Sequence, residues 1–474
     1  MQIKNVLLVN LWNVGEKVGT VLPPLGLMYL GSVLEENDYK VKIIDGGAFD
    51  YSDEEIISES KKFNPHILGV YCNTSGFKRV MGLCRKFKRV MNIPTIIGGP
   101  HAIIQPEEII VNDCVDYVAT GEGEITLPEL LYALNNHRPL KNILGVYYKR
   151  WGKIHKNPRR PFIENLDSIP FPARHLVEMD KYYIAPHHYK RKPIANMIAS
   201  RGCPYSCSFC SSSKMWGHRY RVRSVENVIE EIKFLIKEHG VKEVGFWDDL
   251  FGANKEWVHK FCDQLIKEKI NITWYCEFRV NCVDPDLLKK MKKAGCWCIL
   301  YGFESMNQLL LDSINKRCTV QQIRNAIKWS KEAGIEIRAN YILGLPNETP
   351  EIAKAVIKEI CKANPSFVKF TLLTPFPGTQ LYDDVKAGKW GNMLDESDKL
   401  TNHIANFKPY GYESLEQLES IYHYAYMKFY FRPKYIASRL FSIRSVDDIK
   451  KTIHGAGIIV KKYIFDKFSK TITV

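Results

Sequence analysis

Three cysteines stand within eight residues of the sequence, at Cys203, Cys207 and Cys210, in the run RGCPYSCSFCSSS. A zinc site normally takes four protein ligands, often as two separated C-x2-C pairs. The C-x3-C-x2-C spacing supplies only three thiolates, and no neighbouring cysteine or histidine completes the set. A four-iron cluster held by three thiolates keeps one iron for an outside ligand. The spacing therefore favours an iron–sulfur cluster with an open corner, and a non-catalytic iron–sulfur or zinc-binding protein is the alternative.

The elements around the cysteines form a repeating series of strand and helix patterns. Five amphipathic helical segments separate six apolar runs, which span residues 194–200, 242–249, 272–280, 296–305, 336–346 and 366–379. Such alternation predicts a parallel sheet. The cysteine loop follows the first of these strands, at the carboxyl end where the sites of parallel barrels form.

A second strand–helix series occupies residues 1 to about 150. Short apolar runs predict buried strands at 6–10, 40–45, 67–72, 95–99 and 116–120, and their alternation with helices indicates a doubly wound parallel sheet. A dinucleotide fold would carry G-x-G-x-x-G after a strand. No such motif follows the first strand, and the glutamates of TGEGE would repel a phosphate, so dinucleotide binding is not expected.

The cysteine motif, with Phe209 before the last cysteine, resembles the signature of the radical S-adenosylmethionine (SAM) superfamily. The resemblance implies that SAM chelates the open iron through its amino and carboxylate groups, and that its reductive cleavage yields a 5′-deoxyadenosyl radical. It also implies a partial (β/α)6 barrel. By the same resemblance, SAM contacts fall on the strand ends and on the residue before the last cysteine: Phe209, Asp248, Asp249, Arg279, Glu304, Ser305 and Arg338.

Each of these strand-end residues has a structural alternative. Asp248 or Asp249 could cap the following helix, and Arg279 could pair with Glu277 or Glu304. The remaining cysteines fit helix or strand patterns and are expected to pack as small apolar side chains.

The first 135 residues resemble the cobalamin-binding domain that precedes radical SAM domains, in the runs PPLGLMYLGSVLEENDYKVKIID, GGPHAIIQPEEII and VDYVATGEGEITLPELL. The resemblance implies that cobalamin contacts Asn73, Thr74, Ser75, Gly98, Gly99, Pro100, His101, Gly121 and Glu122. A D-x-H-x-x-G motif is absent, so no histidine is expected below the cobalt. Trp12, Asn13 and Tyr71 are the candidates for shielding that lower face.

Four segments follow from these patterns: a cobalamin-binding domain (1–150), a linker (151–193), the radical SAM partial barrel (194–382) and a basic, aromatic-rich helical region (383–474). In the linker, LDSIPFPAR resembles a bridging segment of cobalamin-dependent relatives. The last region is expected to cover the barrel opening, with simple helical packing as the alternative. KKYIFDKFSK near the end is a candidate for contact with a membrane surface.

Charge and cysteine content give further information on location and partners. The chain has 474 residues, a formal net charge of +15, and twelve basic against six acidic residues after position 400. Thirteen cysteines without a disulfide-like framework suggest a reducing, cytoplasmic compartment. The two resemblances together imply a cobalamin-dependent radical SAM enzyme that methylates an unactivated carbon of a small molecule, lipid or peptide, with radical cyclisation or rearrangement as the alternative. A flavodoxin or ferredoxin is the expected electron donor, and no nucleic acid partner is expected.

Overall fold

The computed structural model describes residues 2–11, 20–185, 188–394, 401, 403–441 and 446–460. It divides the chain into two compact units. The first contains Met1–Tyr183, Lys214–Gly217 and Arg221–Ser224, and the second contains Ile184–Ser213, His218–Tyr220 and Val225–Val474. The chain that follows the cysteines thus contributes short segments to the first unit before it returns to the second.

The first unit is built on a seven-stranded sheet in the order β2-β1-β3-β4-β5-β6-β7. Its strands are β1 (Asn5–Asn10), β2 (Lys40–Asp45), β3 (Ile67–Tyr71), β4 (Thr95–Gly98), β5 (Tyr117–Ala119), β6 (Val146–Arg150) and β7 (Lys153–Lys156). The first five are parallel, and β6 and β7 add an antiparallel hairpin to the edge. This confirms the five predicted strands and the doubly wound class, with the order reversing between β1 and β3.

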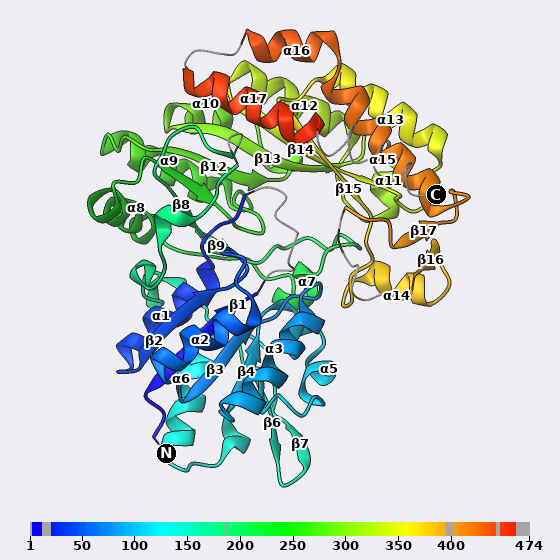
Figure 1. The fold of residues 1–474 in the computed structure, drawn as a ribbon. Coiled ribbons are helices and arrows are strands. Elements are labelled where there is room, and N and C mark those ends of the chain that lie inside the picture. The colour runs from blue at the N-terminus through cyan, green and yellow to red at the C-terminus, as the bar shows by residue number, and fades with distance from the viewer. Residues whose placement is uncertain are drawn as a thin grey trace. The chain divides into compact units, whose positions relative to one another are not determined.

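Helices cover both faces of this sheet (Figure 1). They are α1 (Leu25–Glu36), α2 (Asp53–Phe63), α3 (Phe77–Val90), α4 (Pro100–Ile104), α5 (Pro106–Ile110) and α6 (Gly123–Asn135). Leu7 and Val9 of β1 pack in one apolar cluster with residues of α2, α3 and α5. Val6 and Leu8 point to the other face and pack with α1 and α6, as the two-residue period of a strand requires. A 3-10 turn at Leu140–Asn142 precedes β6, and the linker adds the 3-10 turns Leu166–Ser168, Arg174–Leu176 and Met179–Lys181.

The second unit is built on a six-stranded parallel sheet in the order β15-β14-β13-β12-β11-β8. Its strands are β8 (Ile194–Met197), β11 (Glu243–Phe246), β12 (Thr273–Phe278), β13 (Cys296–Glu304), β14 (Glu336–Leu343) and β15 (Phe367–Leu372). Successive strands in sequence are neighbours in the sheet, which confirms the six predicted strands. The two-residue strands β9 (Ser200–Arg201) and β10 (Arg221–Val222) flank the cysteine segment.

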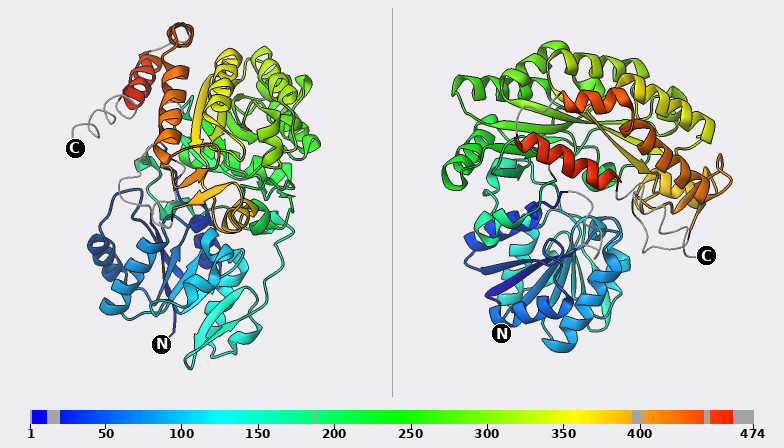
Figure 2. Two further views of the ribbon diagram at one scale, coloured as in Figure 1. Left: turned by 90° about the vertical axis from the view of Figure 1, so that its right-hand side faces the viewer. Right: turned by 45° about the horizontal axis from the view of Figure 1, so that its top comes forward.

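The longer helices between these strands lie along the outside of the sheet (Figure 2). They are α8 (Val225–His239), α9 (Lys255–Lys267), α10 (Pro285–Lys293), α12 (Val320–Glu332) and α13 (Pro350–Ala363). The short helices α7 (Ser212–Trp216) and α11 (Gln308–Ser313) and a 3-10 turn at Val280–Cys282 lie in the connections, and most of α7 belongs to the first unit. Side-chain caps begin several of them: the Asn254 and Asp284 side chains accept hydrogen bonds from the first turns of α9 and α10.

The C-terminal region contains α14 (Gln380–Lys386), β16 (Gly391–Met393), β17 (Phe407–Pro409), α15 (Leu415–Tyr430), α16 (Pro433–Leu440) and α17 (Val446–Val460). Two tyrosines of α15 complete the hydrogen bonds of the edge strand β15. The Tyr426 hydroxyl donates to the Phe370 carbonyl at 3.0 Å and accepts from the Phe370 N–H at 3.2 Å, and Tyr430 does the same for Val368. The aromatic stripe therefore packs on the sheet edge, and a role over the barrel opening stays a prediction.

Two features were not predicted from the sequence. The antiparallel pair β16–β17 interrupts the expected helical C-terminal region. The first unit also runs on through Tyr183, because β6 and β7 extend its sheet beyond position 150 and the linker packs on it. The four segment boundaries given above stay predictions.

Candidate active site

The three cysteines lie in a loop braced by the segment before α12. The Ser208 N–H donates to the Ile314 carbonyl at 3.0 Å, and the Asn315 amide donates to the Ser206 carbonyl at 2.8 Å. Cys207 is only 8% exposed. The loop is thus fixed on a packed support, which holds thiolates in place for a metal centre.

The cysteine side chains interact electrostatically with one another, so they lie close together. Burial raises the pKa of Cys203, and it raises the pKa of Cys210 to about 12, with the neighbouring Cys207 adding to both effects. Thiols in this state need a metal or a cation to ionise. The described residues contain no set of three side chains at the spacing that one metal ion requires. A four-iron cluster binds each thiolate at a separate iron.

Arg279, after β12, supplies a cation directly at the cysteines. Its Nη1 donates to the Cys207 sulfur at 3.2 Å, and its guanidinium lies 3.7 Å from the centre of the Tyr205 ring. A second N–H group donates to the Lys316 carbonyl. Arg279 therefore makes neither of the ion pairs that were its structural alternatives. Its charge would stabilise the anionic thiolates of a cluster.

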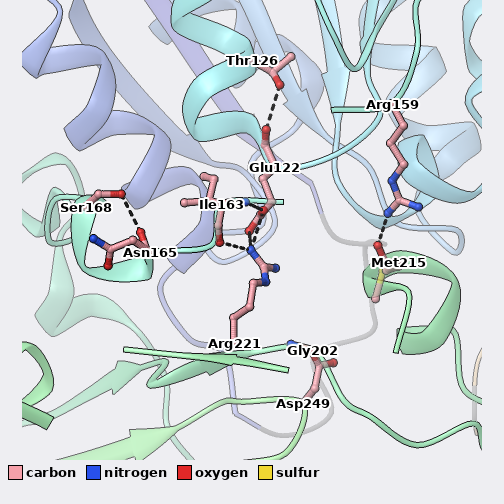
Figure 3. A network of polar contacts seen from close by, with 10 residues as sticks. All are labelled: Glu122, Thr126, Arg159, Ile163, Asn165, Ser168, Gly202, Met215, Arg221 and Asp249. Atoms are coloured by element: carbon pink, nitrogen blue, oxygen red, sulfur yellow. Dashed lines mark hydrogen bonds and ion pairs between the residues drawn. The ribbon is translucent and has the colours of Figure 1, made fainter. Parts of the chain in front are cut away.

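The two aspartates after β11 have different surroundings. Asp248 is 2% exposed, and its carboxylate accepts from the Ala199 N–H at 3.0 Å and from the N–H and hydroxyl of Ser200. Burial raises the pKa of Asp248 to about 7. Asp249 is exposed and accepts from the Gly202 N–H at 3.1 Å, next to the cysteines (Figure 3). Asp248 thus holds the backbone before the cysteine loop, whereas Asp249 lies at the surface beside that loop.

Glu304 ends β13 in a strained backbone conformation, with a φ of 62° that non-glycine residues rarely adopt. Its carboxylate accepts from the Lys316 Nζ at 2.7 Å, and both side chains are less than 10% exposed. The hydroxyl of Ser305 accepts from the Asn307 N–H at 3.2 Å. Glu304 is therefore oriented by Lys316 at the carboxyl end of the sheet, while Ser305 shapes the turn into α11.

Arg338 lies away from these residues. In the sheet it pairs with Leu300 and Phe367, whereas Glu304 pairs with Tyr341, three residues nearer the carboxyl end. At about 3.3 Å per residue, this puts Arg338 roughly 10 Å below the level of Glu304. Its guanidinium lies 5.4 Å from the centre of the Trp297 ring. The structure thus brings together the cysteines, Asp249, Arg279 and Glu304, but not Arg338.

In the first unit, the loops after β3, β4 and β5 lie at the carboxyl ends of the parallel strands. A Cβ added to Gly121 would meet no described atom within 4 Å, and one added to Gly98 would meet only the Ala119 Cβ, at 4.0 Å. Gly99 has a φ of 101°, and a Cβ there would come within 2.8 Å of the Cys72 carbonyl oxygen. A side chain at Gly99 would clash with the backbone of Cys72 and would strain the backbone at this φ. Gly98 and Gly121 instead leave open surface on which a ligand can lie.

Polar groups of the predicted cobalamin loops also meet. The Asn73 side chain accepts from the Gly76 N–H at 2.7 Å and from the Ser75 hydroxyl at 3.3 Å. The Thr74 hydroxyl lies 3.3 Å from the His101 Nδ1, and burial lowers the pKa of His101 to about 4, so its imidazole is neutral at neutral pH. Pro100 begins α4. The structure therefore gathers the loops after β3 and β4 at one end of the sheet.

Glu122 has a different environment from its neighbours. Its carboxylate is buried and accepts from Arg221 and from the Ile163 N–H (Figure 3).

Of the three candidates for the lower face of cobalt, Trp12 and Asn13 lie outside the described residues. Tyr71 ends β3, and burial raises its pKa to about 12.

Comparisons with known proteins agree with both halves of this arrangement. The model of the B12 binding domain matches residues 12–131, and that of the radical SAM superfamily matches residues 197–360. An uncharacterized methyltransferase of Pyrococcus horikoshii is 38% identical over 92% of this chain and 94% of its own length. The chain belongs to the cobalamin-dependent radical SAM family.

Other members of this family are similar over most of the chain. The anaerobic magnesium-protoporphyrin IX monomethyl ester cyclase of Rubrivivax gelatinosus is 31% identical, over 78% of this chain and 68% of its own length. Among solved structures, the radical SAM methyltransferase TsrM of Kitasatospora setae, with cobalamin and a 4Fe-4S cluster bound, superposes with a TM-score of 0.70 at 16% identity, over 92% of this chain and 90% of that one. The cobalamin-dependent radical enzyme OxsB gives 0.74 at 19% identity, over 97% and 72%. These two share the fold.

As a member of the family, the protein is an enzyme that uses a 4Fe-4S cluster, SAM and cobalamin. The three thiolates with the Arg279 cation fit the cluster, and the open glycines of the first unit fit cobalamin. The assignment of individual residues to SAM and cobalamin stays a prediction.

Sequence reasoning missed several residues of the site. Lys316 lies in the run LDSINKR, twelve residues after Glu304. Nothing in this run except the charge of the lysine indicated that it would pair with a carboxylate. Tyr205, inside the cysteine motif, supports the Arg279 guanidinium. Arg221 pairs with Glu122, and its sequence RYRVRS shows several basic residues without indicating which one is buried. Phe209, which was predicted, lies 5.9 Å from the Lys316 Nζ, measured to the ring centre.

Proposed function

We propose that the protein is a SAM-dependent methyltransferase that transfers a methyl group from cobalamin to an unactivated carbon of a small molecule. The observation that carries this proposal is the relative named as a methyltransferase, which aligns with nearly the whole chain, both units included. When bound, the cluster supplies the electron that splits SAM, and cobalamin carries the methyl group.

In this proposal, the residues of the second unit hold and orient SAM. The exposed carboxylate of Asp249 accepts hydrogen bonds from the SAM amino group, and Glu304, oriented by Lys316, accepts them from the ribose hydroxyls. Arg279 holds the Cys207 thiolate and offsets its negative charge. Asp248 keeps the backbone before the cysteine loop in place. Gly98 and Gly121 let the backbone of the first unit approach cobalamin.

Radical cyclisation is the second candidate, because relatives named as cyclases align with 78% of this chain. The two functions differ in their products. Methylation of cobalamin by SAM releases S-adenosylhomocysteine, whereas radical oxidation releases 5′-deoxyadenosine alone. The test incubates the anaerobic, reconstituted protein with SAM, reduced cobalamin and a reductant, and quantifies both products by mass spectrometry. Formation of S-adenosylhomocysteine that requires cobalamin supports the methyltransferase, and its absence while 5′-deoxyadenosine forms supports the cyclase.

The partners follow from the same chemistry. We propose a flavodoxin or ferredoxin as electron donor, and a cytoplasmic location, which suits thirteen cysteines that are all free. No described helix is long and apolar enough to cross a membrane. A peripheral contact is supported by exposed apolar side chains near the C-terminus, among them Phe441 and Ile453, which are 83% and 68% exposed. KKYIFDKFSK itself lies outside the described residues.

A further inference from the structure

A buried ion pair joins two distant parts of the sequence within the first unit. Glu122, directly before α6, accepts two hydrogen bonds from the Arg221 Nη1, at 3.0 and 2.8 Å. The side chains are 2% and 5% exposed. The Ile163 backbone completes the contact, because its N–H donates to Glu122 at 2.8 Å and its carbonyl accepts from Arg221 at 2.6 Å. Figure 3 shows these groups converging on the Arg221 guanidinium.

The surroundings of Arg221 are not those of a pair selected for stability alone. Its guanidinium lies 4.8 Å from the centre of the Phe162 ring and 5.6 Å from that of Trp216. Its Nε and Nη2 are buried without a hydrogen-bond partner in the part of the chain that the structure describes. Burying two charges costs much of what their attraction returns, and an apolar pair would often be as stable. The ion pair therefore fixes a particular geometry at some cost in stability.

Arg221 lies eleven residues after Cys210, in the segment that leaves the cysteine loop. This segment is attached to the first unit at more than one point. Arg159 donates to the Met215 carbonyl, and the Ser224 N–H donates to Asp167 at 2.9 Å. Asp167, in the linker run LDSIPFPAR, thus contacts the chain that follows the cysteines within the first unit.

Glu122 is also tied to the other functional loop. It follows Gly121, which leaves open surface after β5, and its carbonyl accepts from the Thr126 hydroxyl at 3.0 Å inside α6. The loop that carries Gly121 and Glu122 is thus joined through the ion pair to the chain that continues from Cys210. A change in this loop on cobalamin binding would reach that chain through the same contact.

We propose that the Glu122–Arg221 ion pair couples cobalamin binding to SAM cleavage at the cluster. This inference rests on the proposed function. Glu122 and Arg221 act in it as positioning residues, and neither contacts the reacting atoms. Without the pair, each reaction partner still binds, but cobalamin no longer affects the rate at which SAM is cleaved.

The test compares the rate of 5′-deoxyadenosine formation with and without saturating cobalamin, in the full-length reconstituted protein. We expect cobalamin to change the rate in the native protein by about fivefold, the scale of ordinary coupling between sites. In Glu122→Gln and in Arg221→Lys, the two rates should become equal, since the first removes the negative charge and the shorter lysine side chain withdraws its cation from Glu122 and from the Ile163 carbonyl. Glu129→Gln is the matched control, because Glu129 lies on α6 and pairs with Arg160 at the surface.

Further measurements make the result decisive. Iron content, the electron paramagnetic resonance (EPR) spectrum of the reduced cluster and the cobalamin retained after gel filtration should match the native protein in all variants. The apparent Tm of the two ion-pair variants should fall, because each leaves a buried charge without its partner, and all rates are measured well below it. A native rate ratio that persists in both variants, or a native protein indifferent to cobalamin, would overturn the coupling. Loss of cobalamin from Glu122→Gln but not from Arg221→Lys would overturn it too, by assigning the carboxylate to cobalamin itself. If the native protein cleaves no SAM, the proposed function fails instead.

Discussion

At the scale of single residues, the contact between Arg279 and Cys207 makes the most direct prediction. A cation donating to a cluster thiolate stabilises the reduced, more negative state. Replacing Arg279 with leucine should lower the reduction potential of the cluster by several tens of millivolts and slow SAM cleavage about tenfold or more. A redox titration followed by EPR measures this. Arg317→Leu, an exposed change in the adjoining loop, is the control; equal potentials in the two variants would contradict the role of Arg279.

The open glycines give a second residue-scale prediction. Gly121→Ala adds a methyl group that meets no described atom, so the apparent Tm should stay within about 1 °C of the native value. If cobalamin lies on this surface, its affinity should fall about tenfold or more. The control is Gly26→Ala, at another glycine whose Cβ would be free, in α1. Equilibrium titration with hydroxocobalamin measures both, and unchanged affinity in Gly121→Ala would remove this loop from the cobalamin site.

At the residue level, the predictions were drawn from short local motifs. The cysteine spacing and the carboxylates at strand ends could be read from short runs, and the structure places Asp249, Arg279 and Glu304 around one loop. The roles predicted for Arg338 and Glu122 stay predictions. They depend on features that short motifs do not show: the depth of a side chain along its strand, and a partner 99 residues later in the chain.

At the scale of elements, α15 closes the edge of the six-stranded sheet with two tyrosine hydroxyls. Tyr426→Phe and Tyr430→Phe each leave an N–H and a carbonyl of β15 without a protein partner. Each should lower the free energy of unfolding by about 1 to 3 kcal/mol, and the double variant should expose β15 to aggregation. Thermal unfolding with light scattering measures both. Tyr424→Phe, on the exposed side of α15, should change neither. Native stability in the double variant would contradict this account of the edge.

The elements themselves were largely predictable, because the two-residue and 3.6-residue apolar periods are strong in both parallel sheets. The pair β16–β17 was not, since three-residue strands carry too few positions to show a period. The α15 tyrosines showed up in the sequence as an aromatic stripe, but the hydroxyls that bond to β15 could not be separated from ordinary core packing.

At the scale of the whole second unit, a buried carboxylate ties the C-terminal region to the sheet. The Tyr412 hydroxyl donates to Glu348 at 2.6 Å, and the Gly344 N–H donates to the same oxygen at 2.6 Å. Burial raises the pKa of Glu348 to about 7. A raised pKa in the folded state means that folding favours the protonated form, so stability is highest below the unfolded pKa of about 4.5 and falls as the pH rises to about 7.

Glu348→Gln imitates the protonated form and should remove this dependence. Near pH 8, the free energy of unfolding of the variant should exceed that of the native protein by an amount on the order of 2 to 3 kcal/mol, and its apparent Tm should be higher. The two proteins should have the same stability near pH 4.5. Calorimetry across this range measures the difference. Glu413→Gln, at an exposed position beside Tyr412, should leave it unchanged. A gain at low pH instead of high pH would contradict the assigned direction.

The central claim concerns the cluster that three cysteines hold and the corner that SAM occupies. The most direct measurement adds SAM to the anaerobically reduced, reconstituted protein and follows the EPR spectrum of the cluster together with 5′-deoxyadenosine. The account predicts that SAM changes the spectrum and is cleaved, and that Cys207→Ala abolishes both. A metal centre whose spectrum is the same with and without SAM, and which releases no 5′-deoxyadenosine, would contradict it.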